Sequence, residues 1–258
     1  MSDRFELFLE EPEAEIVNLV DGREALRHLE RVGRTCYRSE DRITSDSYAG
    51  FLRGVIDRGH EAMLEHVSVT IRFRTDRGVT HELVRHRLAA YAQSSTRYCN
   101  YSQDRFGNGI HVIKPLYFNP QEEPRPVEVP THSSSRGCTF PSEGVVLRLC
   151  AFDVWMISMF YASWAYLTLT RVFGRQPQEA RSVLPQSTAS DIYVTCNLRE
   201  WRHIFNLRAL GTTGAPHPDM RRIMLPALAA MRKEFPLLFD DIYEQCVEKG
   251  FLEKAQAI

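Results

Sequence analysis

Three consecutive basic side chains, Arg85, His86 and Arg87, interrupt a stretch whose other residues are mostly small or apolar. The apolar neighbours indicate a partly packed segment, and a charge buried there would need a partner or an anion. Ser95 and Arg97 follow after a gap of seven residues. Arginine forks and hydroxyls together favour a phosphate or another planar polar anion as the ligand. The alternative is a helix end whose basic last turn faces solvent and complements the helix dipole.

The composition is that of a globular protein with no general affinity for polyanions. The 258 residues suffice for one large domain or two small ones, which fold without disulfides. A formal net charge of -1 argues against an electrostatic grip on nucleic acid or an acidic membrane. Six widely spaced cysteines fit reduced thiols, and the acidic N-terminus is unlike a signal peptide. We therefore expect a cytoplasmic protein.

Hydrophobic periodicity and turn residues predict a mixture of strands and helices. We expect strands at residues 14–20, 67–73, 98–102, 110–113 and 187–195. We expect helices at residues 23–34, 47–58, 79–88, 177–184, 197–208, 221–230 and 237–249. A turn is expected at 76–78, and loops at 119–144 and 209–219. The most apolar run, 145–172, is broken by charges and is interpreted as a buried helix, with a membrane span as the weaker alternative.

The helix expected at 197–208 has a clear apolar face. A rotation of 100° per residue places Leu198, Trp201, Phe205 and Arg208 together on it. We expect the three apolar side chains in the core and the remaining polar positions of this helix on its other faces.

Two histidines and two glutamates lie within seven residues, from His60 to His66. A metal site is one interpretation of this group, but the zinc-binding helix needs histidines four residues apart on one face. A polar loop that leads into the following strand explains the pattern better. We therefore expect no metal here.

The basic segment at 85–87, followed by Ser95 and then Arg97-Tyr98, resembles the signature of the flavin-dependent thymidylate synthases. Residues 178–185 are similar to a second motif of that family, in which Glu-x-Ala-Arg precedes an apolar pair and proline. The polar positions of 197–208 are similar to a third. Together these matches extend over most of the chain.

The resemblance implies an α+β fold with a central, mostly antiparallel sheet flanked by helices and a helical portion. Residues 1–258 would form a single catalytic domain with a loop or insertion around 119–144. It implies a methyltransferase that converts dUMP to dTMP, with methylenetetrahydrofolate as carbon donor and NADPH-reduced FAD as hydride source. Members of the family are homotetramers whose sites use several subunits, so we expect the same here, with no nucleic-acid polymer or membrane as partner.

The same resemblance assigns roles to individual residues. The expected flavin contacts are Cys36, His60, Glu65, Arg85, His86, Arg87, Asn197, Arg199 and His203. His66 is expected to support the contacts of His60 and Glu65, and His217, in the loop at 209–219, is expected to line the flavin site. The expected nucleotide contacts are Glu82, Arg85, Gln93, Ser95, Arg97, Arg181 and Arg208.

The catalytic candidates are Arg208, Arg85 and Ser95. An arginine beside the uracil carbonyl could stabilise enolate charge as C5 becomes nucleophilic. The hydroxyl of Ser95 is interpreted as a binding group, because no base is evident in the sequence to activate it.

Three positions depart from the family pattern. Ala90 and Ala92 replace hydroxyl or amide residues, and His203 replaces an asparagine. At the two alanines, the loss of a side-chain hydrogen bond would weaken one flavin or loop contact by about 1 kcal/mol, too little to overturn the match. Two alternatives stay open: a non-catalytic nucleotide-binding module, which has no use for the flavin positions, and an RNA-binding protein, which the net charge disfavours.

Overall fold

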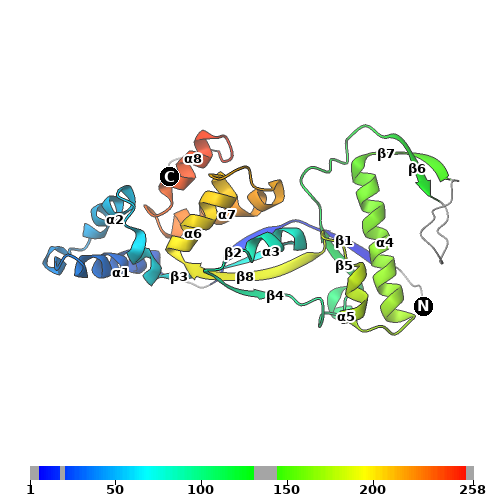
Figure 1. The fold of residues 1–258 in the computed structure, drawn as a ribbon, viewed down its shortest axis with the longest axis horizontal. Helices are drawn as coiled ribbons and strands as arrows, with labels where there is room; N and C mark the ends of the chain where they lie inside the picture. The colour runs from blue at the N-terminus through cyan, green and yellow to red at the C-terminus, as the bar shows by residue number, and fades with distance from the viewer. Residues whose placement is uncertain (1–5, 18–20, 131–143, 254–258) are drawn as a thin grey trace. The chain divides into compact units, whose positions relative to one another are not determined.

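The computed structural model describes residues 6–17, 21–130 and 144–253, and these form two compact units (Figure 1). Unit 1 comprises the residues up to Glu10 together with Ser95–Thr188, and unit 2 comprises Glu11–Ser94 together with the chain from Ala189 onward. Formation of a single catalytic domain by residues 1–258 stays a prediction.

Unit 2 is built on a four-stranded antiparallel sheet, visible along its length in Figure 1. In spatial order its strands are β2 (Glu13–Ile16), β3 (Ser68–Asp76), β8 (Ala189–Asn197) and β4 (Ala90–Gln93). β3 and β8 pair over their full length, from Ser68 opposite Asn197 to Asp76 opposite Ala189. Every second side chain of β3 is buried, so one face of the sheet supplies the core. This sheet and its flanking helices confirm the expected α+β fold.

Helices pack against this sheet and complete the core of unit 2. They are α1 (Gly22–Thr35), η1 (Glu40–Arg42), α2 (Ser47–Asp57), η2 (Glu61–His66), α3 (Arg77–Leu83), α6 (Leu198–Phe205), η5 (Asn206–Leu210), α7 (Pro218–Glu234) and α8 (Asp240–Glu248). Trp201 is fully buried, and its indole N–H donates to the carbonyl of Val69 at 3.0 Å. Leu198 and Phe205 are also fully buried, which confirms the predicted core face of α6.

The end of α6 differs from the expected regular helix. Residues Asn206–Leu210 form a π-helical turn, in which the N–H of Gly211 bonds to the carbonyl of Asn206 five residues earlier. This wider turn advances each residue by less than 100° around the axis. Arg208, expected on the same face as Trp201, lies within this π turn and is partly exposed, whereas Trp201 is fully buried.

Unit 1 contains a parallel pair of strands and one long helix. Its strands and helices are β1 (Glu6–Glu10), η3 (Asp104–Phe106), β5 (Gly109–Ile113), β6 (Arg125–Pro130), β7 (Gly144–Leu149), α4 (Ala151–Arg171), α5 (Pro177–Ala180) and η4 (Arg181–Val183). Tyr166 and Leu167 of α4 are fully buried against Ile110 and Val112 of β5. Other side chains of α4 remain exposed, so the helix is buried on one face only. None of the helices among the described residues combines the length and the apolar character needed to cross a membrane.

Two predictions near the basic segment are wrong. The expected turn at 76–78 is the start of α3, because the Asp76 carboxylate accepts a hydrogen bond from the N–H of Val79 at 2.9 Å and caps the helix. The expected helix at 79–88 ends at Leu83. The hydroxyl of Tyr91 lies 2.8 Å from the carbonyl of Leu83 and 2.6 Å from that of His86, so a tertiary contact holds the chain in a turn there.

Unit 1 departs from the sequence predictions at two places. The expected strand at 98–102 is a turn, in which the carbonyl of Ser95 accepts hydrogen bonds from the N–H groups of Tyr98 and Cys99. The described ends of the loop expected at 119–144 form the antiparallel pair β6–β7, and the apolar run is helical only from Ala151. Residues 131–143, and residues 18–20 of the first expected strand, lie outside the described residues.

Candidate functional site

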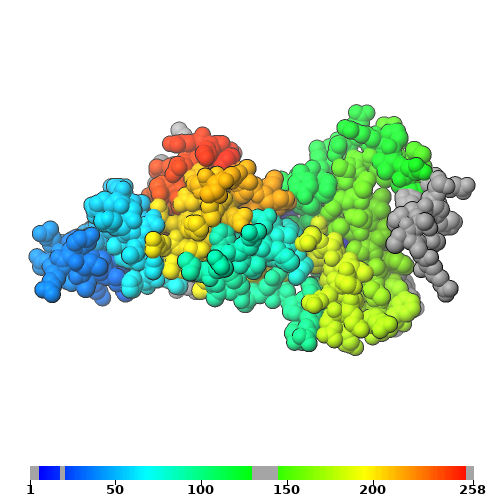
Figure 2. All heavy atoms as spheres, in the orientation of Figure 1, coloured from blue at the N-terminus to red at the C-terminus, as the bar shows by residue number. Residues whose placement is uncertain are grey.

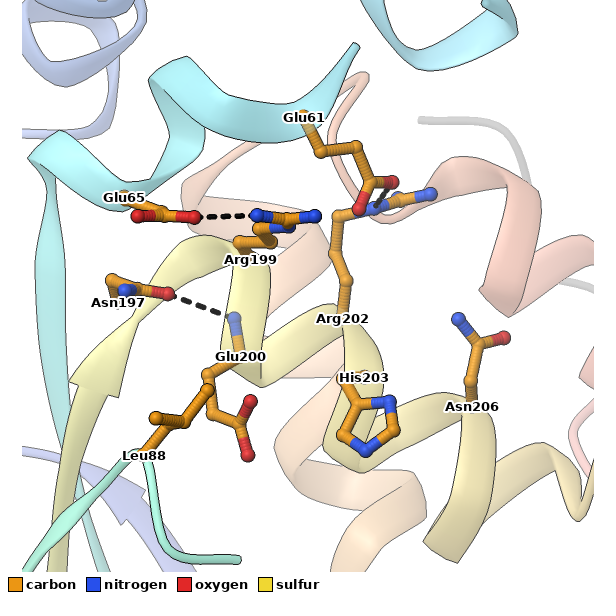
Figure 3. A pocket seen from close by; sticks show the side chains of 9 residues that line it. All are labelled: Glu61, Glu65, Leu88, Asn197, Arg199, Glu200, Arg202, His203 and Asn206. Carbon is orange, nitrogen blue, oxygen red and sulfur yellow. Dashed lines mark hydrogen bonds and ion pairs between the residues drawn. The ribbon is translucent and has the colours of Figure 1, made fainter. Parts of the chain in front are cut away.

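Two adjoining cavities of unit 2 bring together residues from the basic segment, η2 and α6. The first, of about 640 Å³, is lined by Glu61, Glu65, Leu88, Asn197, Arg199, Glu200, Arg202, His203 and Asn206 (Figure 3). The second, of about 680 Å³, is lined by Arg85, His86, Arg87, Leu88, Glu200, His203, Leu207 and Arg208. Leu88, Glu200 and His203 line both cavities, so a ligand in one would share a wall with a ligand in the other.

The first cavity offers hydrogen-bond donors, of which Asn197 and Arg199 are held by neighbouring residues (Figure 3). Arg199 donates to the carboxylate of Glu65 at 2.5 Å, and Asn197 caps α6 by accepting from the N–H of Glu200 at 2.8 Å. The Asn197 amide NH2 is therefore not needed for capping and can donate to a ligand. The imidazole of His203 makes no hydrogen bond to any described residue. Such donors suit the carbonyl and nitrogen acceptors of a flat heterocycle.

The second cavity is dominated by the guanidinium of Arg208. It donates to the Glu82 carboxylate at 2.8 Å and, through Nε, to Nε2 of His86 at 3.1 Å. Arginine has five N–H donors in a planar fork, so at least one N–H on each terminal nitrogen remains for a ligand. With 21% of its side chain exposed, Arg208 is held rigidly yet remains accessible. This is the geometry of an anchored donor for an oxygen that gains negative charge.

His86 and Glu200 are buried at the common wall of the two cavities. Burial and the neighbouring Arg208 lower the pKa of His86 to about 4, so its ring is neutral at physiological pH. Burial raises the pKa of the Glu200 carboxyl, although His203 opposes this shift. The rings of His86 and His203 meet edge to face, with their centroids 6.1 Å apart.

His86, Glu200 and His203 also have the side chains of a metal site. One ligand atom from each lies within 4.8 Å of the other two. However, His86 already uses its Nε2 lone pair to accept from Arg208, and that guanidinium would repel a dication beside it. This arrangement favours a polar wall for an organic ligand. The sequence expectation of no metal stays a prediction.

Several residues expected in the site lie outside the linings of both cavities. Gln93 uses its amide NH2 to donate to Thr80 and Ser190 within unit 2. Glu82 acts through Arg208, as described above. Among the expected flavin residues, Cys36, His60, His66 and His217 lie outside the two linings. Their predicted flavin contacts stay predictions.

The nucleotide positions expected at 95, 97 and 181 all belong to unit 1. Arg97 donates to the side-chain carbonyl of Gln178 at 3.2 Å, and Gln178 precedes Arg181 by one helical turn. Ser95 Oγ accepts the backbone N–H of Arg97 at 3.2 Å. The exposed guanidinium of Arg181 has no partner within the described part of unit 1. Unit 1 thus offers two cations and a hydroxyl to an anion.

Sequence reasoning missed Glu200, which lines both cavities, and the pair Glu61 and Arg202, which lines the first. The i, i+3 spacing of Glu200 and His203 places both on one side of a helix and could have indicated a shared site. The partner of Arg202 could not be foreseen, because Glu61 is 141 residues away in the chain.

Comparison with known proteins identifies the family. Residues 18–237 match the family described as thymidylate synthase complementing protein. A curated flavin-dependent thymidylate synthase of Mycolicibacterium vanbaalenii is 34% identical over 226 residues, which cover 86% of this chain and 80% of that protein. One of Corynebacterium aurimucosum is 30% identical over 86% of this chain and 82% of its own length.

Solved structures share the fold at lower identity. A UMP/dUMP methylase, PolB, from Streptomyces cacaoi, bound with 5-Br dUMP, has a TM-score of 0.66 and 21% identity, covering 92% of this chain and 96% of that one. Thymidylate Synthase X from Helicobacter pylori, with FAD and dUMP, has a TM-score of 0.61 and 18% identity, covering 91% and 99%. These similarities establish the fold, and the activity is argued below from the residues of the site.

Proposed function

The chain belongs to the thymidylate synthase complementing protein family, and from that premise we propose that it is a flavin-dependent thymidylate synthase. It would methylate C5 of dUMP with methylenetetrahydrofolate as carbon donor. FAD reduced by NADPH would supply the hydride when bound. The observation that supports this most strongly is the anchored Arg208 fork beside a cavity of fixed hydrogen-bond donors.

The first cavity fits the ring system of a flavin. Its donors, the amide of Asn197, the guanidinium of Arg199 and the imidazole of His203, match the polar edge of an isoalloxazine. Leu88 adds an apolar surface in the same wall. Arg85, from the second cavity, would meet both flavin and nucleotide, since the two cavities adjoin.

The second cavity suits the pyrimidine. We place the uracil carbonyl against the free N–H groups of Arg208, which would stabilise negative charge as C5 becomes nucleophilic. Glu82 and His86 keep the guanidinium in place before the substrate arrives, so little reorganisation is needed during the reaction. No described cysteine lines this cavity, and the proposal requires no enzyme thiol.

Within unit 1, considered by itself, Arg97 and Arg181 are proposed as phosphate ligands, with Ser95 as a binding hydroxyl. Two arginines flanking Gln178 give the charge and the planar donors that a phosphate needs. Among the described residues the Ser95 hydroxyl hydrogen-bonds only to the backbone N–H of Arg97, so no base activates it as a nucleophile.

A homotetramer is supported by the exposed aromatic side of α4, a helix whose yellow-green atoms lie open on this side of unit 1 in Figure 2. Phe160 is 46% exposed, Tyr161 61% and Trp164 45%. Large apolar side chains grouped on one helix typically mark an interface. A cytoplasmic location is supported by the free thiols at positions 36, 99, 150, 196 and 246.

The test is thymidylate formation by the purified protein with FAD, NADPH, methylenetetrahydrofolate and dUMP. We expect product that depends on all four and that falls at least tenfold in Arg181→Ala, because a phosphate ligand is lost. Arg175→Ala removes a neighbouring exposed arginine and serves as the matched control. UMP is assayed in parallel, since a structural relative is a UMP/dUMP methylase. Nucleotide binding without turnover would instead support the non-catalytic module.

A further inference from the structure

The hydrogen bond between Arg208 and His86 determines where the imidazole proton lies. Arginine is always a donor, so the Nε–H of Arg208, 3.1 Å from His86 Nε2, requires Nε2 to be an unprotonated acceptor. A neutral imidazole carries one proton. His86 therefore carries it on Nδ1, and the opposite tautomer would face Arg208 with two N–H groups against each other.

The protonated nitrogen faces a buried carboxylate. Glu200 Oε1 lies 3.9 Å from His86 Nδ1, and only 9% of the Glu200 side chain is exposed. The backbone N–H of Glu200 bonds to Asn197, but its carboxylate makes no hydrogen bond to any described residue. At 3.9 Å the contact is longer than a direct hydrogen bond, so it acts through charge or a bridging water. A negative charge on this side favours the proton on Nδ1.

We propose that Glu200 is a positioning residue: by holding the proton of His86 on Nδ1, it keeps Nε2 free to fix the Arg208 guanidinium against the reacting pyrimidine. The chain of contacts runs from Glu200 through His86 to Arg208, and Glu82 holds the same guanidinium from its other side. Glu200 lines the wall shared by the two cavities, and the role proposed for it acts through His86. This inference rests on the proposed function in one respect, that the ligand of Arg208 is the pyrimidine of dUMP.

The charged groups around His86 give the arrangement a pH dependence. Arg208 from η5, His203 and Glu200 from α6, and Glu82 from α3 lie around the His86 ring. Arg85 and Arg87 line the same cavity, and Tyr91 and Cys196 interact electrostatically with Glu200. Burial raises the pKa of Glu200, so its charge is lost on acidification earlier than that of an ordinary glutamate. Protonated Glu200 no longer favours the Nδ1 proton, and turnover is expected to fall as pH decreases through this pKa.

The variant Glu200→Gln removes the charge while keeping the size of the side chain. We expect kcat to fall about ten- to a hundredfold, the scale of a misplaced catalytic group, while KM for dUMP and FAD binding change less than threefold. The acid limb of the kcat profile assigned to Glu200 is expected to disappear. Glu244→Gln, the same change at an exposed position of α8, is the control and is expected to behave as the unaltered protein.

The tautomer is read independently of turnover. Nitrogen NMR of protein with 15N-labelled histidine distinguishes protonated from unprotonated ring nitrogens, and His86→Asn identifies the signals of His86. We expect Nδ1 protonated in the unaltered protein and a measurable Nε2-protonated fraction in Glu200→Gln. An Nε2-protonated His86 in the unaltered protein would overturn the proposal, as would an unchanged kcat in Glu200→Gln. If the unaltered protein makes no thymidylate, the proposed function fails, but the spectra still decide the tautomer.

Discussion

Arg202 ties together three segments around the first cavity, and its removal is the most quantitative test of how that cavity is built. Its Nε donates to Glu61 at 2.8 Å, and its two terminal nitrogens bond to both carboxylate oxygens of Asp241 at 2.8 and 2.7 Å. It also donates to the carbonyl of Leu238. Because only 6% of its side chain is exposed, these bonds form largely out of water.

The expected cost of Arg202→Met follows from this burial. Breaking a fully buried pair costs about 3–5 kcal/mol, whereas an exposed pair is worth about 0.2–1 kcal/mol. Asp241 is 42% exposed and Glu61 24%, so water screens part of the interaction. We therefore expect a loss of about 2–3 kcal/mol in the free energy of unfolding, equivalent to a fall of about 4–12 °C in Tm for a chain of this size.

Thermal unfolding followed by circular dichroism measures this change. Adding Asp241→Leu to Arg202→Met removes a carboxylate that the first change leaves without its cation, so the double variant is expected to recover part of the lost Tm. A Tm of Arg202→Met within about 1 °C of the unaltered protein would refute the reasoning. An unchanged Tm would mean that the free-energy cost of desolvating the guanidinium equals the gain from its contacts with Glu61, Leu238 and Asp241.

Three further predictions concern the second cavity and the surface. Arg208→Lys should lower kcat about a hundredfold or more in the thymidylate assay, because an ammonium cannot bond Glu82 and His86 while offering a planar fork to substrate. The pKa of His86 is lowered to about 4 in the folded protein, so on acidification the unfolded chain binds the proton first. The free energy of unfolding, measured with urea, should therefore decrease as the pH is lowered from about 6.5 to 4. This decrease should be smaller in His86→Asn. Tyr161→Ser combined with Trp164→Ser should shift sedimentation velocity toward smaller species without lowering helicity, because both side chains are exposed on α4.

Local patterns predicted those elements whose periodicity was strong. The alternation in 67–73 became β3, and the apolar face of Leu198, Trp201 and Phe205 became the buried side of α6. Predictions went wrong where a contact from outside the segment decides the backbone. The hydroxyl of Tyr91 ends α3, and the pairing of β6 with β7 joins segments separated by residues outside the description.

In the candidate site, too, the sequence predicted which residues take part but did not predict their long-range contacts. Motif resemblance selected Arg85, His86, Arg199, His203 and Arg208, which line the cavities because short segments of α6, η5 and the turn after α3 carry them. It could not reveal which carboxylate meets which cation. Those pairings depend on how α6 lies beside the basic segment and η2, which is a property of the fold.

Because of the π turn of η5, the geometry of the second cavity depends on the number of residues between α6 and Gly211. In a regular α-helix each N–H bonds to the carbonyl four residues earlier, whereas in this π turn the bond spans five residues. A regular helix continued from α6 would therefore need one residue fewer, and the residues after the turn would be rotated about the helix axis relative to their present positions. The segment Asn206–Leu210 is therefore one residue too long for ideal helical bonding, and that surplus residue aims Arg208 at His86. Shortening the turn by one residue would give a better helix and an arginine that points elsewhere.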